Sequence, residues 1–169
     1  LLGRRMTLGH GVWMTESDLD HVAETDTRIC HNCSSNLRLR SGIAPLQLLL
    51  ARGVNVAIGI DEAGINDDRD MLQEMRLVLK LHRVPGIELS PPTAYQVLHM
   101  ATVNGAYASW FGDRIGTLEP GKRADLVILS RDILSVPDTE LLGTKVLATI
   151  VNGKVLYESP ELTPASTTN

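Results

Sequence analysis

The chain has 169 residues, of which 43% are hydrophobic, and this is enough apolar material to bury the core of one ordinary domain. Its 16 Lys and Arg against 20 Asp and Glu give a net charge of −4, and the absence of a long basic cluster excludes nucleic acid and anionic membranes as expected partners. There is no apolar run of the ~18 residues that a membrane span needs and no signal-peptide pattern, so we expect a cytoplasmic protein whose two cysteines stay reduced.

Three short apolar segments in the first half of the chain predict strands. The third is a nearly continuous run of Val, Ala and Ile, which is typical of a parallel strand buried on both faces. Helix-like segments alternate with these strands, and alternation at this spacing predicts βαβ units and therefore an α/β fold with a parallel sheet. The strands are expected over residues 6–10, 28–31 and 54–60.

The helices that follow these strands carry start and stop signals. Thr15 and Asp18 form a capping-box pattern at the start of the first helix, and Pro45 opens the second, which ends before Gly53. Residues 32–44 are rich in Ser, Asn and Gly and predict a long polar loop. The helices are expected over residues 16–24, 45–52 and 70–82.

The second half of the chain predicts two helices and then a small β unit. Asn152-Gly153 separates two strand-like segments and is a strong signal for a tight hairpin. The expected elements are helices over 90–100 and 102–110 and strands over 124–130, 145–151 and 154–157. The chain is thus expected to divide into an α/β unit (1–112), a β unit (113–158) and a flexible tail (159–169).

Polar residues follow each strand of the first unit at its carboxyl end, where parallel α/β folds carry their chemistry. Asp61 follows the third strand, and it could bind a metal and accept a proton from water, or it could serve as a turn or cap residue. His10 lies between two glycines after the first strand, and it could act as a general acid or base or polarise a substrate oxygen, or it could cap the next helix. Position alone leaves these alternatives open.

Other residues with reactive side chains give weaker signals. Cys30 and Cys33 form a lone C-x-x-C, but a zinc site needs a second pair, and a redox motif needs a helix where a loop is predicted. His31, at the end of the second strand, is expected to be partly buried, and its role is left open. A structural or solvated role is expected for His21, His82 and His99.

Six segments of the chain form a recognisable set in their order and spacing. They are HGVWMT (10–15), HNCSSNLRLRSGIAP (31–45), GVNVAIGID (53–61), ATVNGA (101–106), GTLEPGKRADLV (116–127) and VNGK (151–154). Together they resemble the amidohydrolase superfamily, in the branch of the S-adenosylhomocysteine, guanine and cytosine deaminases and the triazine chlorohydrolases. The resemblance runs from about residue 6 to residue 158. It implies a distorted (β/α)8 TIM-like barrel with a small β-sandwich, in which the first three strands are barrel strands six, seven and eight and the later strands belong to the sandwich.

The resemblance implies a hydrolase that acts on C–N bonds of a small nucleobase-like or heterocyclic substrate through water activated by a divalent metal, zinc or alternatively iron. Asp61 then binds the metal and shuttles a proton, and His10 contacts the substrate or the tetrahedral intermediate. Deamination, dechlorination and opening of a cyclic amide stay open, as does a non-catalytic chain that keeps the fold. The expected substrate-binding residues are Ser34, Ser35, Asn36 and Glu62, the last of which adds a negative charge beside the metal.

The family also uses an H-x-H pair after barrel strand one and a His after strand five, and the segments that would hold them are absent from this chain. The chain begins with Leu1 and enters a strand-like segment almost at once, which favours a truncated or processed polypeptide. We therefore expect the C-terminal part of a longer enzyme, inactive by itself. Its open sheet edge would require the N-terminal part of the barrel or self-association.

Overall fold

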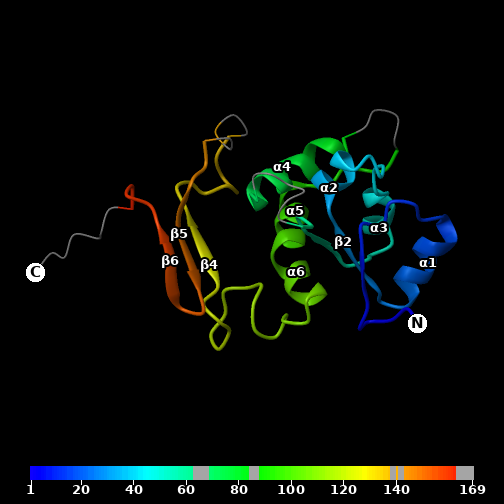
Figure 1. Cartoon of the computed structure of the whole chain (residues 1–169), viewed down its shortest axis with the longest axis horizontal. Coiled ribbons are helices and arrows are strands. Elements are labelled where there is room, and N and C mark those ends of the chain that lie inside the picture. The colour runs from blue at the N-terminus through cyan, green and yellow to red at the C-terminus, as the bar shows by residue number, and fades with distance from the viewer. Residues whose placement is uncertain (63–68, 84–87, 138–139, 141–142, 163–169) are drawn as a thin grey trace, which may run out of the picture. The chain divides into compact units, whose positions relative to one another are not determined.

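The computed structural model describes residues 1–62, 69–83, 88–137, 140 and 143–162, which divide into two units, Leu1–Gly112 and Asp113–Asn169 (Figure 1). Each unit contains one three-stranded sheet. The strands of the first unit are β1 (Thr7–Gly9), β2 (Arg28–His31) and β3 (Val56–Ile58), and its helices are α1 (Glu16–Glu24), α2 (Cys33–Arg38), α3 (Leu46–Ala51), α4 (Met71–Leu81), α5 (Ala94–Ala101) and α6 (Val103–Ala108). The second unit contains β4 (Leu126–Leu129), β5 (Val146–Val151) and β6 (Lys154–Glu158).

The first unit is built on a parallel sheet in the order β1-β2-β3, which confirms the predicted α/β class. In the register of this sheet, Cys30 pairs with Gly9 on one side and with Ala57 on the other. The carboxyl ends of the three strands therefore lie at one edge of the sheet. All three residues of β3 are buried, as the continuous apolar run predicts.

Helices cover this sheet and complete the core. α5 and α6 pack against β3, α6 also contacts β2, and α1 packs against α3. None of the helices in the described parts of the chain is long and apolar enough to cross a lipid bilayer. The core side chains that are least exposed include Leu19, Ile29, Leu46, Leu49, Val56 and Val78.

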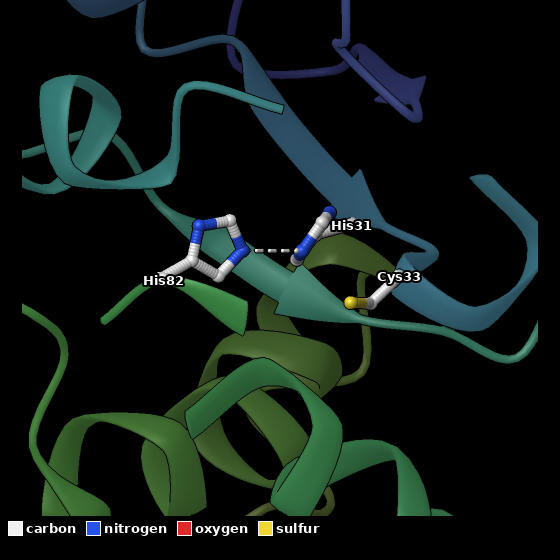
Figure 2. Close-up of side chains that lie close together, drawn as sticks. All are labelled: His31, Cys33 and His82. Carbon is white, nitrogen blue, oxygen red and sulfur yellow. Dashed lines mark hydrogen bonds between the residues drawn. The ribbon is translucent and has the colours of Figure 1, made fainter. Parts of the chain in front are cut away.

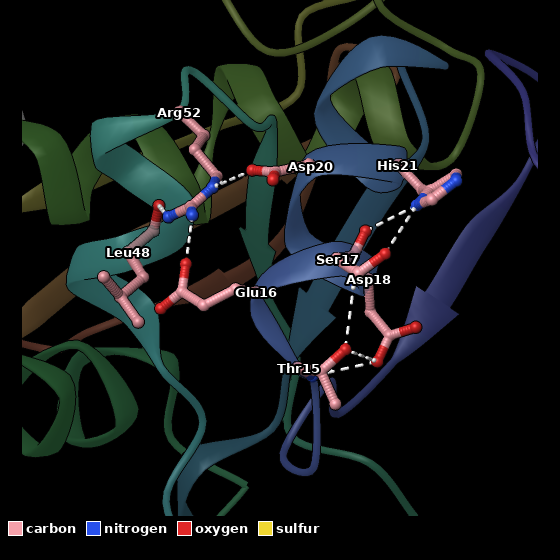
Figure 3. Close-up of polar contacts among 8 residues, drawn as sticks. All are labelled: Thr15, Glu16, Ser17, Asp18, Asp20, His21, Leu48 and Arg52. Carbon is pink, nitrogen blue, oxygen red and sulfur yellow. Dashed lines mark hydrogen bonds and ion pairs between the residues drawn. The ribbon is translucent and has the colours of Figure 1, made fainter.

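The start of α1 is fixed by the predicted capping box, in which Thr15 and Asp18 exchange side-chain-to-backbone hydrogen bonds (Figure 3). On the same helix, Glu16 and Asp20 both pair with Arg52 at the end of α3, and the Arg52 Nε to Asp20 Oδ1 distance is 2.7 Å. Because both carboxylates are exposed, these ion pairs orient α1 against α3 more than they add to stability.

Helix α2 lies inside the stretch 32–44, so the prediction of a continuous loop there is wrong. Ser and Asn favour caps and loops because their side chains compete for backbone hydrogen bonds. Here the side chains of Ser35 and Asn36 are instead engaged by Asp61 and His10, which come from other strand ends. Tertiary hydrogen bonds thus override the local preference of this segment.

The second unit is an antiparallel sheet in the order β4-β5-β6. The predicted hairpin between β5 and β6 is confirmed, and Asn152 and Gly153 both have the positive φ that its tight turn requires. A flexible tail is expected from residue 159, but Ser159 is buried and its N–H donates to the Leu147 carbonyl, and Glu161 pairs with Lys145. Residues 163–169 lie outside the described residues.

Candidate active site

The ends of β1 and β3 bring together His10 and Asp61, the two residues for which the sequence predicts catalytic roles. His10 Nε2 lies 3.6 Å from Asp61 Oδ2. The backbone N–H of His10 donates to the carbonyl of Cys30 on the neighbouring strand β2, which fixes where the loop leaves the sheet. The side chains of His10 and Asp61 are 40% and 24% exposed, so a ligand can reach both groups.

Helix α2 supplies a buried polar partner to each of these residues. Ser35 Oγ donates to Asp61 Oδ2 over 2.6 Å, and His10 Nδ1 lies 2.7 Å from Asn36 Oδ1. Because an amide oxygen can only accept, the His10 Nδ1 atom carries the proton of this bond, and Nε2 is left facing Asp61. Ser35 and Asn36 are almost fully buried, so α2 acts as a rigid support behind the exposed pair.

The backbone at both predicted catalytic residues is in the left-handed region, with φ of 69° at His10 and 60° at Asp61. This conformation costs a residue other than Gly roughly 1–2 kcal/mol, and His and Asp are among the types that adopt it most often. Gly59, just after β3, leaves room for the side chain of Asn32, because a Cβ atom there would lie 2.4 Å from Asn32 Oδ1. The strand ends thus hold a strained conformation that aims both side chains at one point.

Two other residues with predicted substrate contacts are placed differently. The backbone N–H of Ser34 donates to Glu74 Oε1 on α4 over 2.9 Å, and the Ser34 hydroxyl is buried with no partner among the described residues. Ser34 therefore contacts α4, whereas Ser35 and Asn36 contact the His10–Asp61 pair. Glu62 is exposed and follows Asp61 directly, and residues 63–68 lie outside the described residues.

Both cysteines of the C-x-x-C are free thiols. Burial and then the charge of Asp61 raise the pKa of Cys30, and burial and then the charge of Glu74 raise the pKa of Cys33 to about 12. A redox motif needs a thiolate of lowered pKa, so this geometry argues against redox chemistry. The sequence analysis also disfavours redox chemistry, but on the ground that a loop follows the two cysteines. That ground is wrong, because helix α2 begins at Cys33.

A second cluster of possible ligands, which the sequence does not predict, lies where the end of β2, the start of α2 and the end of α4 meet, and it consists of His31, Cys33 and His82 (Figure 2). His31 and His82 are 1% and 2% exposed, so His31 is more deeply buried than expected and His82 is structural, not solvated. Their Nε2 atoms are 3.1 Å apart. His82 lies 51 residues after His31 and forms no motif with it, so only the tertiary structure reveals the cluster.

Among the described residues, His10 and Asp61 at the strand ends do not belong to a group of three or more possible metal ligands. Within the described ranges, the one group of three or more His, Cys, Asp or Glu side chains that could share an ion is His31, Cys33 and His82. The carboxylate of Asp61 can therefore supply one ligand to a metal at the strand ends. A zinc ion bound there would need two or more further ligands.

Comparison with known proteins places this chain in a family. A family model described as the amidohydrolase family matches residues 1–156. The chain belongs to the amidohydrolase family. A 5-methylthioadenosine/S-adenosylhomocysteine deaminase of Syntrophomonas wolfei is 37% identical to this amidohydrolase chain over 169 residues, which cover 95% of this chain and 39% of that relative.

Solved structures of zinc-bound hydrolases share the fold. An adenosine deaminase from Xanthomonas campestris with bound zinc has a TM-score of 0.84 and 32% identity, over 99% of this chain and 40% of its own. The atrazine chlorohydrolase of Arthrobacter aurescens, complexed with zinc, has a TM-score of 0.80 and 28% identity, over 96% of this chain and 38% of its own. This chain thus spans about two fifths of the length of the relatives that it matches.

The buried histidine pair makes the stability of the first unit depend on pH. Burial, followed by the charges of His82 and His10, lowers the pKa of His31 from 6.5 to about 3, and burial lowers the pKa of His82 to about 4. Between about pH 6.5 and pH 4 the unfolded chain protonates both rings, whereas the folded protein keeps them largely neutral. The free energy of unfolding should therefore fall as the pH drops from 6.5 toward 4, by up to about 1.4 kcal/mol per pH unit for each ring.

Urea denaturation at a series of pH values, in the presence of a metal chelator, measures this dependence. The variant His82→Gln should show a shallower loss of stability between pH 6.5 and 4 than the unaltered protein. His21→Gln, which changes an exposed histidine of α1, is the matched control and should keep the original slope. An unchanged slope in His82→Gln would contradict the assignment.

Proposed function

We propose that this chain is the C-terminal part of a zinc-dependent amidohydrolase that hydrolytically deaminates a small nucleobase-like or heterocyclic molecule. The observation that carries the proposal is the meeting of His10 and Asp61 at the carboxyl ends of parallel strands, each held by a buried side chain of α2. A relative of 37% identity is a deaminase of adenosine derivatives, and an adenosine deaminase of similar structure binds zinc.

In this proposal β1, β2 and β3 are strands six, seven and eight of a (β/α)8 barrel, and β4 to β6 are part of a β-sandwich. The parallel order of the first sheet supports the barrel assignment, as does the likeness to enzymes of which the chain spans about two fifths. The sandwich assignment is supported by exposed apolar side chains on β6, which further strands would cover. These side chains are Val155, Leu156 and Tyr157.

Asp61 fits the role of one zinc ligand, because its carboxylate is partly exposed and one of its oxygens is oriented by Ser35. A catalytic zinc ion needs about three protein ligands, and this chain contains no H-x-H pair. The other ligands therefore belong to a segment outside this chain. When bound, the metal lowers the pKa of water enough to supply a nucleophile near neutral pH.

Residues of this chain position Asp61 and His10 for proton transfer. Ser35 holds Asp61 Oδ2, so the carboxylate is positioned to accept a proton from the attacking water and to pass it to the leaving nitrogen. Asn36 binds the Nδ1 proton of His10, so Nε2 points into the site, where it contacts the substrate. Glu62 adds negative charge at the rim of the site, and Ser34 supports α2 through Glu74.

Displacement of chloride from a triazine is a second candidate for the same site. The structural likeness to atrazine chlorohydrolase, with a TM-score of 0.80, favours it. Both reactions replace a group on a ring carbon with water-derived oxygen, so the same proton-handling residues serve either one. Incubation with 5′-deoxyadenosine, S-adenosylhomocysteine and a chlorotriazine separates them, since the first reaction releases ammonia and the second releases chloride.

In the complete enzyme, Asp61→Asn should lower kcat/KM for ammonia release by at least about 10²–10⁴-fold, because it removes a general base as well as a metal ligand. Asp26→Asn is the matched control. Asp26 also has a positive φ, of 55° against 60° for Asp61, but it lies at the opposite end of the sheet and pairs with Arg4. Asp26→Asn should keep full activity. Undiminished ammonia release by Asp61→Asn would overturn the proposed role.

The proposal also predicts how the 169-residue chain behaves without the rest of the barrel. Among the described strands, β1 pairs with β2 alone, which leaves one backbone edge open for another strand. Light scattering of the purified chain should therefore give a dimer or a larger species and no deaminase activity. A monodisperse monomer of 18.4 kDa that unfolds cooperatively would contradict the prediction.

A further inference from the structure

Three metal-ligating side chains other than His10 and Asp61 meet in the interior of the first unit. His31 is the last residue of β2, Cys33 is the first of α2, and His82 is the C-cap of α4. All three are buried, and one ligand atom from each lies within 4.8 Å of the others. Figure 2 shows the hydrogen bond between the two imidazole rings, which are tilted relative to one another, with the sulfur of Cys33 turned toward the same space.

The spacing of these atoms is close to that of a zinc site. Zinc binds histidine nitrogen at about 2.0–2.1 Å and cysteine sulfur at about 2.3 Å, so tetrahedral angles place two nitrogens about 3.4 Å apart and nitrogen and sulfur about 3.6 Å apart. The Nε2 atoms of His31 and His82 are 3.1 Å apart. Because all ligand atoms lie within 4.8 Å of one another, Cys33 Sγ has to move inward by at most about 1.2 Å.

The surroundings also suit a soft divalent cation. Buried histidines that stay neutral keep a lone pair available for a metal. Glu74 of α4 lies near enough to Cys33 to raise the pKa of its thiol, after the larger effect of burial, and the same negative charge attracts a cation.

We propose that His31, Cys33 and His82 supply three ligands of a structural zinc site that is separate from the active site, with a water molecule as the fourth ligand. On binding, the Cys33 thiol gives up its proton to solvent and its sulfur bonds to zinc. The proton shared between the imidazoles moves to the other nitrogen of its own ring, so both Nε2 atoms become ligands. Because the cluster is buried, the metal enters as the chain folds.

Such a site would tie together three elements that meet behind the active site. β2, α2 and α4 each supply one ligand, and α2 also carries Ser35 and Asn36, which hold Asp61 and His10. Zinc would therefore fix the helix that supports the catalytic pair without touching the substrate. The inference does not depend on the proposed function, because it concerns only this interior cluster.

Folding the native protein in the presence of Co²⁺ in place of zinc tests the site by a signal independent of activity. A thiolate-to-cobalt charge-transfer band should appear in the near ultraviolet at one equivalent of metal. Cys33→Ser should abolish the band, and Cys30→Ser, three residues away, is the matched control that should retain it. Asp61→Asn should also retain it, which separates this site from the catalytic metal.

A second measurement needs no change at the cluster and so stays informative if Cys33→Ser fails to fold. X-ray absorption of zinc-loaded protein carrying only Asp61→Asn should show one sulfur at about 2.3 Å together with nitrogens at about 2.0 Å. A spectrum with no sulfur neighbour would overturn the proposal. So would the absence of a cobalt band from the unaltered protein, or its loss in Cys30→Ser instead of Cys33→Ser.

Discussion

The hydrogen bond from Ser35 to Asp61 is the contact on which the candidate site depends. Its length of 2.6 Å and its ionisable acceptor make it a charge-assisted bond, which is roughly twice as strong as a bond between neutral groups. The Ser35–Asp61 bond connects α2 to the end of β3, and the hydrogen bond between Asn36 and His10 connects α2 to the end of β1. Three segments that are separate in the sequence are thereby locked into one arrangement.

This arrangement offsets the cost of the left-handed backbone at the site. Left-handed φ values at His10 and Asp61 would each disfavour the folded loop if nothing held their side chains. Gly59 removes the clash that a side chain would make with Asn32 at the turn before Asp61. The sheet, the glycine and the buried face of α2 therefore act together to present two polar groups at one partly exposed point.

The parallel sheet and its helices could be predicted because the sequence signals for these elements are local. β3 is a short apolar run, and α1 begins at a capping box. The order of the strands then brought His10 and Asp61 to one edge, as the polar residues after each strand indicated. The helical state of Ser35 and Asn36 could not be predicted in this way, since it depends on partners 26 residues away in the sequence. The buried contact between His31 and His82 is similarly non-local and leaves no spacing pattern in the sequence.

The central claim, that α2 holds Asp61 in the site, is tested most directly by a double-mutant cycle on the free energy of unfolding with Ser35→Ala and Asp61→Ala. Alanine at position 61 is strained by the positive φ, but this strain is present both in Asp61→Ala and in the double variant, so it cancels from the coupling energy. The account predicts a coupling of about 1.5–3 kcal/mol, whereas Ser35→Ala combined with Asp26→Ala, at the far end of the sheet, should be additive within about 0.5 kcal/mol. No coupling between Ser35 and Asp61 would contradict the account.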